Sequence, residues 1–234
     1  MTEKAIRLQK FLAKAGVCSR REGENYIAAK RVRVNGEIVT MPGTKVDPEK
    51  DEVLVDGEPV ALKEAPVYIM LNKPVGYISS CRHAGQAVVL DLVDVRERVF
   101  PVGRLDKDST GLLLMTNDGR IHHRLAHPSF DHEKEYVVEV RRAIGDEDLR
   151  RMAQGIVLDG KITRQAVVRR ESKTRFRIIL QEGRKRQIRR MAEAVGNEVI
   201  QLHRVRMGSL ELKALPEGKW RYLTKQEICE LTRS

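Results

Sequence analysis

Short apolar runs bounded by turn residues recur through the second half of the chain. The runs at 67–71 and 112–115 are continuous, which is typical of strands buried on both faces, and the latter ends at an Asn-Asp-Gly turn. Other strand-like runs occur at 134–140, 166–168 and 176–180, and helical spacing appears near 120–126, 146–154 and 184–195. Because strands outnumber helices without regular alternation, the pattern predicts an α+β domain on a largely antiparallel mixed β-sheet.

The first sixty residues have a different pattern. Apolar positions within 8–15 lie on one face of a short helix that Gly16 can close. Ser19 and Glu22 form a Ser-x-x-Glu capping box, which predicts a second helix to about Ala29.

Two strand-and-turn patterns follow these helices. Residues 32–34 lead into Asn35-Gly36 and a returning strand at 38–39, and 53–57 repeats the arrangement. The sequence therefore predicts a small module at 1–62, a linker at 63–66 and a second domain at 67–234.

The charge is concentrated in two regions. The formal net charge is +11; residues 161–206 hold fourteen basic and four acidic residues, and residues 1–40 hold nine and four. One basic run is usually a solvated surface, but two runs on differently patterned segments favour a nucleic acid partner. Aromatic residues make up only 4%, which argues against a stacking platform for single strands. The predicted RNA-binding side chains are Arg7, Lys10, Arg20, Arg21, Arg31, Arg33, Arg104, Arg184, Lys185, Arg186 and Arg190.

The cysteines, the histidines and the amino-terminal segment argue against disulfide-rich, metal-binding and membrane proteins. Cys18, Cys81 and Cys229 are far apart, which argues against a disulfide framework or a zinc site. His123 and His127 have helical spacing but lack the Glu of a zincin, so no metal site is expected. With no signal-like start and no run of transmembrane length, we expect a cytoplasmic protein that does not bind membranes.

The candidate chemistry centres on residues 103–119, where a polar, glycine-bounded loop precedes a buried strand. Its Gly-Arg-Leu-Asp and Ser-Thr-Gly-Leu-Leu sequence resembles the catalytic motif of the RNA pseudouridine synthases, which implies that Asp106 is catalytic. The same resemblance implies that Arg104 fills the gap left when the target base leaves its stack. Asp106 and Asp108 also form a carboxylate pair, but residues two apart in a loop need not face one another.

Two further segments carry the resemblance. In the block 180–191, helical projection puts Arg189 at the edge of the buried face, while Arg186 and Arg190 point to solvent or RNA. This block resembles the family's third motif, which implies that Arg189 forms a salt bridge with the catalytic Asp106. The segment 131–140 resembles the motif whose tyrosine lies against the target base, and this implies that role for Tyr136.

The resemblance spans almost the whole chain. The amino-terminal helices and Val-Arg-Val-Asn-Gly resemble the small alpha-L RNA-binding module of a ribosomal protein. The chain is identified as a member of the RsuA/RluB/RluF-like rRNA pseudouridine synthases, with a leaning to large-subunit RluF-like members. This implies isomerisation of uridine in ribosomal RNA without cofactor or metal, by a monomer.

Several alternatives stay open from the sequence. Asp106 can act as a nucleophile or as the base of a ribose-elimination route. Small-subunit rRNA or tRNA is an alternative substrate, and a non-catalytic ribosome-assembly factor is the rival from another class.

Overall fold

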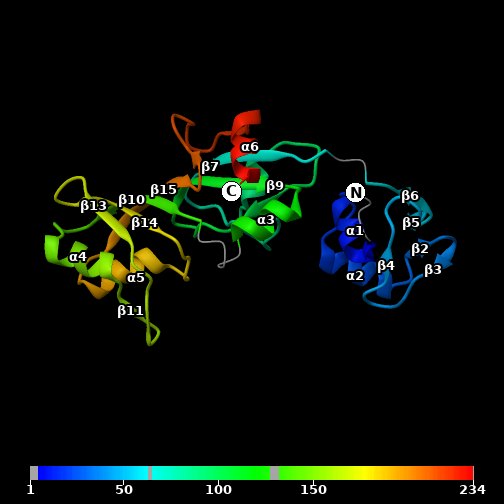
Figure 1. The fold of residues 1–234 in the computed structure, drawn as a ribbon, viewed down its shortest axis with the longest axis horizontal. Helices are drawn as coiled ribbons and strands as arrows, with labels where there is room; N and C mark the ends of the chain where they lie inside the picture. Colours follow the sequence, from blue (N-terminus) through cyan, green and yellow to red (C-terminus); the bar gives the residue numbers. More distant parts are fainter. Residues whose placement is uncertain (1–4, 63–64, 127–131, 234) are drawn as a thin grey trace. The chain divides into compact units, whose positions relative to one another are not determined.

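The computed structural model describes residues 5–62, 65–126 and 132–233. In that part of the chain no helix is both long and apolar enough to cross a membrane. The chain divides into two compact units: the first runs to Pro66 and includes Arg96–Arg98 and Asn117–Gly119, and the second contains the rest. Figure 1 labels most of the helices and many of the strands of both units. The predicted linker at 63–66 includes residues 63 and 64, which lie outside the described residues.

The first unit begins with the two predicted helices, α1 (Leu8–Lys14) and α2 (Arg20–Ala28). The capping box is confirmed: the Glu22 backbone N–H donates to Ser19 Oγ at 3.1 Å, and the Ser19 N–H donates to Glu22 Oε2 at 2.8 Å. Strand β1 (Ile6–Arg7) pairs with β4 (Lys45–Val46) beside α1.

A small antiparallel sheet completes this unit. Its order is β3 (Glu37–Ile38), β2 (Val32–Val34), β5 (Val53–Val55) and β6 (Glu58–Val60). Asn35 and Gly36 have φ values of 51° and 83°, so the predicted tight turn between β2 and β3 is confirmed. The core of the unit is formed by Leu8, Phe11, Leu12, Cys18, Ile27, Val32, Val46, Val53 and Val55.

The second unit is built on a nine-stranded sheet within the described residues (Figure 1). Its main path is β13-β14-β10-β15-β9-β7-β17, with β8 added to β9 and β16 added to β15. All these pairings are antiparallel except that of β9 with β15, which confirms the predicted largely antiparallel mixed sheet. The strand bounds are β7 Tyr68–Lys73, β8 Phe100–Val102, β9 Thr110–Thr116, β10 Lys134–Val140, β13 Val167–Arg170, β14 Arg175–Leu180, β15 Val199–Met207, β16 Leu210–Glu211 and β17 Trp220–Tyr222.

The parallel junction of β9 and β15 depends on Gly111. Its φ is +105°, and a Cβ atom there would lie 2.3 Å from the backbone oxygen of Arg204. Only glycine has both the conformational freedom and the absent side chain that this approach requires. The two strands thereby bring the loop before β9 close to the middle of β15.

Strands β7 and β9 are covered on both faces, which explains their continuous apolar sequence. On one face Leu112 and Leu114 pack with α3 (Gly119–Ala126) and α6 (Lys225–Arg233). On the other face Leu113 packs against the segment that contains the 3₁₀ turn η1 (Val89–Leu92). This burial makes the centre of the sheet a rigid support for the loops at its ends.

Helices α4 (Asp146–Gln154) and α5 (Gln187–Ala194) cover the β10, β14 and β15 part of the sheet. Leu149 and Met152 of α4 and Ile188 and Met191 of α5 pack on apolar side chains of these strands. Between α4 and β13 lies a hairpin of β11 (Val157–Leu158) and β12 (Lys161–Ile162).

Two expected element boundaries were wrong, and one central strand was not predicted. Strand β7 continues through Asn72 and Lys73, because these polar residues hydrogen-bond inside the protein and need not face water. Helix α5 begins at Gln187 and not near 184, because Arg186 adopts a left-handed conformation with φ 51°. Strand β15 was not predicted, because charged residues such as Arg204 interrupt its apolar alternation.

Candidate active site

The loop between β8 and β9 presents Asp106 at the edge of the buried sheet. Leu105 anchors this loop, since its side chain is buried and its backbone pairs with Ser79. Ser79 Oγ donates to the Leu105 carbonyl at 2.8 Å and accepts from the Leu105 N–H at 3.0 Å. The Gly76 N–H donates to the Lys107 carbonyl at 2.8 Å, so the loop is also held just after Asp106.

Lys73 is a buried cation that hydrogen-bonds to the backbone of the same loop. Its ammonium donates to three backbone carbonyls, those of Pro74 at 3.0 Å, Asp106 at 3.1 Å and Ser109 at 2.7 Å. The side chain is fully buried, and this desolvation lowers the pKa of Lys73 to about 8. Lys73 therefore positions the backbone of the loop and not the carboxylate itself.

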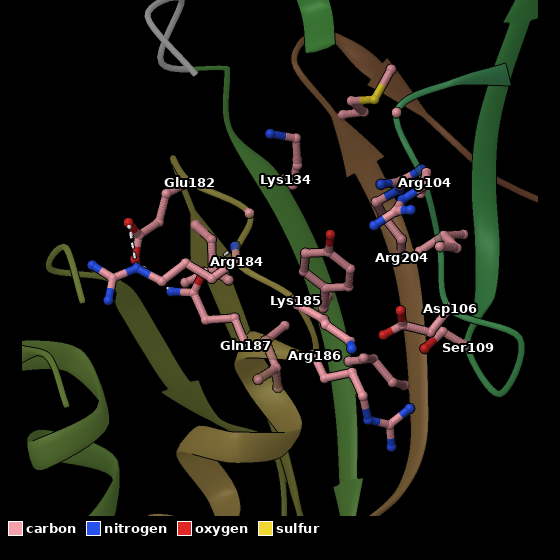
Figure 2. A pocket seen from close by; sticks show the side chains of 18 of the residues that line it. Arg104, Asp106, Ser109, Lys134, Glu182, Arg184, Lys185, Arg186, Gln187 and Arg204 are labelled. Atoms are coloured by element: carbon pink, nitrogen blue, oxygen red, sulfur yellow. Dashed lines mark hydrogen bonds and ion pairs between the residues drawn. The ribbon is translucent and has the colours of Figure 1, made fainter. Parts of the chain in front are cut away.

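The Asp106 side chain lines a cavity of about 300 Å³. Figure 2 shows Asp106 and Lys185 projecting into this cavity from different parts of the chain. Among the described residues, none makes a hydrogen bond or an ion pair with the Asp106 carboxylate. The carboxylate is half-buried and free to interact with a ligand, while its backbone is fixed.

Arg189 is buried behind the loop, but its ion pair is made with a different carboxylate from the one expected. Its Nη1 donates to the Val199 carbonyl at 2.9 Å and its Nη2 to the Asp108 carbonyl at 2.8 Å. Its Nε lies 3.3 Å from Asp108 Oδ2. The expected salt bridge with Asp106 is therefore corrected: the guanidinium lies under the loop, where backbone carbonyls and Asp108 surround it. Burial lowers the pKa of Arg189, with the Asp108 charge opposing this shift.

Tyr136 lies on β10 at the other side of the cavity. In the sheet register it stands between Ile178 of β14 and Arg204 of β15, and it also lines the cavity. Its ring is half-buried and packs against two of the apolar clusters. The structure thus brings Asp106 and Tyr136 to one cavity, while Arg189 supports the loop from outside the lining.

Three of the arginines predicted to bind RNA already form ion pairs or hydrogen bonds within the protein. Arg186 Nη1 lies 3.0 Å from Asp108 Oδ2, and Arg190 Nη2 lies 2.6 Å from Asp159 Oδ1 in the β11–β12 turn. Arg184 donates to the Lys161 and Ile162 carbonyls of β12. Arg186 is exposed as expected, but it precedes the helix and its charge is paired with Asp108; Arg190 is half-buried, because it pairs with the hairpin.

Two other predicted cations have no such partner. Arg104 and Lys185 are exposed at the cavity, and neither hydrogen-bonds nor ion-pairs with another described residue. Both are therefore available to phosphate groups of a ligand.

The six predicted RNA-binding residues of the first unit are all exposed. Arg7, Lys10, Arg20 and Arg21 make no hydrogen bond or ion pair with a described residue. The other two are occupied, as Arg31 pairs with Asp56 and stacks on the Tyr26 ring at 3.9 Å, and Arg33 donates to the Gly36 carbonyl.

Sequence reasoning missed two buried cations, Lys73 and Arg204. Arg204 is only 2% exposed, lines the cavity, and donates from Nε to the Leu112 carbonyl at 2.7 Å. The available signal was a charged residue within an otherwise strand-like run, which requires a buried partner or a ligand. Within the described residues no cluster of three His, Cys, Asp or Glu side chains could hold a metal ion.

Each of the two units matches the model of a known family. Residues 67–194 match the family model described as RNA pseudouridylate synthase, and residues 6–53 match the S4 domain model. The first match contains the Asp106 loop, Tyr136 and Arg189, and the second covers the helices and first strands of the amino-terminal unit.

Several relatives match nearly the whole of this chain, and their sequence identities to it are similar. The chain is 41% identical over 233 residues to the dual-specificity RNA pseudouridine synthase RluF of Escherichia coli K12, covering 99% of this chain and 80% of that protein. It is also 41% identical to ribosomal large subunit pseudouridine synthase B of Bacillus subtilis (96% and 95% coverage) and 40% identical to ribosomal small subunit pseudouridine synthase A of E. coli K12 (97% and 100% coverage). A solved pseudouridylate synthase aligns with a TM-score of 0.71 at 33% identity, covering 97% of this chain and 99% of that one. These near-equal identities do not distinguish between the two ribosomal subunits.

Proposed function

The chain belongs to the RNA pseudouridylate synthase family, and we propose that it converts specific uridines of ribosomal RNA to pseudouridine at the Asp106 cavity. Large-subunit rRNA is the substrate we favour, on the similarity to RluF and to large subunit synthase B. Small-subunit rRNA is the alternative substrate, because a small-subunit synthase is similarly related. A second RNA substrate is a further alternative, because RluF is named a dual-specificity enzyme.

The observation that carries this proposal is the contrast between the Asp106 backbone and its side chain. The backbone carbonyl of Asp106 accepts from the buried Lys73 ammonium, and the next residues are held through Gly76 and Arg189. The carboxylate has no protein partner among the described residues and faces the cavity. A fixed loop with a free carboxylate is what a reaction at a bound nucleotide requires.

The reaction rearranges one nucleotide without an external group. The C1′–N1 bond of uridine breaks, the uracil rotates, and a C1′–C5 bond forms; the C5 proton is lost and N1 gains a proton. Asp106 either attacks C1′ as nucleophile or removes a ribose proton to begin an elimination. Neither route involves a change of redox state, so we propose no cofactor and no metal.

The target uridine must leave its stack to reach Asp106, at a cost of a few kcal/mol. We assign Arg104 to the gap that remains, because it is exposed at the cavity entrance and has no partner among the described residues. We assign Tyr136 to the face of the flipped uracil, because its half-buried ring lines the same cavity. Arg189 acts as a positioning residue through the Asp108 backbone.

The amino-terminal unit contributes RNA selection in this proposal. Arg7, Lys10, Arg20 and Arg21 are exposed on α1, α2 and the residues before them, and their charge suits a neighbouring RNA stem. We further propose a monomer that acts in the cytoplasm, where its rRNA substrate is found.

Asp106→Asn tests the function directly. The substitution preserves shape and removes the charge, so pseudouridine formation should fall below a few per cent of wild type while RNA affinity stays within about twofold. Tritium release from C5-labelled, folded rRNA fragments measures the first quantity, and filter binding measures the second. Asp94→Asn is the matched control, because Asp94 is an exposed carboxylate of the same unit that does not line the cavity.

The outcomes separate the alternatives. Turnover of Asp106→Asn close to that of Asp94→Asn would remove Asp106 from the chemistry. A wild-type protein that binds rRNA tightly without releasing tritium would instead be a ribosome-assembly factor.

A further inference from the structure

The cavity holds more positive charge than the proposed chemistry uses. Among the described residues, its lining contains six cationic side chains but only two carboxylates, Asp106 and Glu182. Glu182 is already occupied, since Gln187 donates to it at 2.7 Å and Arg184 lies 3.4 Å from it. The six cations are Arg104, Lys134, Arg184, Lys185, Arg186 and Arg204.

Arg204 is the most unusual of these cations. It is 2% exposed, and its Nε is fixed by the Leu112 carbonyl of the adjacent strand at 2.7 Å. Its Nη2 is buried and has no hydrogen-bond partner among the described residues. A buried guanidinium with an unsatisfied donor costs free energy unless a ligand completes its shell.

Lys134 adds a second charge beside it. Lys134 begins β10 and lies on the same face as Tyr136, which stands opposite Arg204 in the sheet register. Burial lowers the pKa of Lys134, and the positive charge of Arg204 lowers it further. No described residue makes an ion pair or hydrogen bond with the Lys134 ammonium. Figure 2 shows Lys134, Arg104 and Arg204 in the same part of the cavity.

We propose that Lys134 and Arg204 form a binding site for a phosphodiester group of the RNA next to the target nucleotide, with Arg104 adding charge at its rim. The proposal rests on the proposed function, because it assumes that RNA enters this cavity. A phosphate satisfies both requirements of the site: its charge relieves the repulsion between the two cations, and its oxygens accept from the orphan N–H groups. A neutral uracil carbonyl would meet only the second requirement.

The site would also fix the register of the substrate. Lys134 and Tyr136 are two residues apart on one strand face, so a phosphate held by Lys134 lies next to a base held by Tyr136. Anchoring the backbone beside the flipped nucleotide holds C1′ near the Asp106 carboxylate. Lys134 and Arg204 are therefore substrate-binding residues in this proposal, distinct from the Asp106 chemistry.

The test compares ligands that differ by one phosphate. Uridine, uridine 5′-monophosphate and uridine 3′-monophosphate are titrated into the full-length protein, and dissociation constants are measured by NMR chemical-shift changes. We expect at least one nucleotide to bind about tenfold or more tightly than uridine. Lys134→Gln should remove most of that difference without changing uridine binding, and Lys134→Arg should restore it.

Lys173→Gln is the matched control, because Lys173 is an exposed lysine of the same unit that does not line the cavity. It should bind both nucleotides as wild type does. Arg204→Gln is expected to behave like Lys134→Gln, and a thermal melt shows whether this buried variant is folded.

Equal binding of uridine and both nucleotides, or no detectable nucleotide binding up to about 10 mM, would overturn the site. Unchanged nucleotide binding by Lys134→Gln would do the same. Pseudouridine formation by the wild-type protein is measured separately on rRNA. If that activity is present without phosphate discrimination, the anion site fails while the proposed function stands. If Lys134-dependent nucleotide binding is present without activity, the function fails and the anion site stands.

Discussion

Replacing Lys73 with methionine removes a buried ammonium while preserving an unbranched side chain of similar length. Three backbone carbonyls then lose the Lys73 donor, those of Pro74, Asp106 and Ser109, and only the Asp106 carbonyl keeps another, the Ser109 N–H at 3.1 Å. Because the Asp106 carbonyl is one of them, the substitution disturbs the loop that presents the proposed catalytic carboxylate. It leaves the Asp106 side chain unchanged.

The effect on stability is a difference of two opposing contributions. The Pro74 and Ser109 carbonyls are then left without a donor, at a cost of about 1–3 kcal/mol each, or roughly 2–6 kcal/mol together. The wild-type protein, however, is itself destabilised by burying a charge. Burial lowers the pKa of Lys73 from 10.5 to about 8, which corresponds to roughly 3 kcal/mol near neutral pH. The net loss in Lys73→Met at pH 7 is therefore between about −1 and 3 kcal/mol.

The dependence on pH has a definite sign. Below pH 8 the lysine is protonated in both folded and unfolded states, so the full cost of burying the charge is present. Between pH 8 and 10.5 the unfolded state binds more protons, so the wild type gains stability from this group as the pH rises. The stability of wild type relative to Lys73→Met should then increase by about 2.5 kcal/mol between pH 7 and pH 10.

Urea denaturation of both proteins at the two pH values measures this difference, because the other titrating groups cancel. Lys107→Met is the control, since Lys107 is an exposed lysine of the same loop whose ammonium donates to Gln86 Oε1 at 3.1 Å. This control is measured at the same two pH values. At pH 7, Lys73→Met should lower kcat about tenfold or more with KM nearly unchanged, as expected for a positioning residue. A relative stability of wild type that stays constant or falls toward pH 10 would show that Lys73 keeps an ordinary pKa and that the burial argument is wrong.

Three other perturbations probe separate parts of the molecule. Gly111→Ala should destabilise the protein by more than about 4 kcal/mol in urea denaturation, because its Cβ would meet the Arg204 backbone at 2.3 Å; near-wild-type stability would refute the close approach. Lys185→Ala should lower the salt slope of log K for rRNA by about 0.7–0.9, whereas Arg190→Ala, already paired with Asp159, should leave it unchanged; the reverse order would place the RNA on the hairpin side. A protein beginning at Ala65 should fold, as circular dichroism would show, and lose about tenfold or more in kcat/KM with a similar kcat; inactivity at saturating RNA would mean that the first unit helps to build the site.

The sequence by itself determined the local elements and the residues of the reactive loop. The capping box of Ser19, the Asn35-Gly36 turn and strand β10 follow from short-range rules of capping, turn geometry and hydrophobic period, and the structure has all three. Such rules act over a few residues, so they can be applied without knowing the fold.

Only the tertiary structure decided which charged groups meet. Helical projection placed Arg186 and Arg190 toward solvent, but a left-handed residue before α5 and a distant hairpin gave both of them protein partners. Arg189 pairs with Asp108 and not with Asp106 because its guanidinium lies beneath the loop. Lys73 and Arg204 were unrecognised because their partners are carbonyls up to 92 residues away in the chain. The partner of a long side chain depends on which groups lie near it in the folded protein. These groups come together only when the strands pair, including β9 with β15.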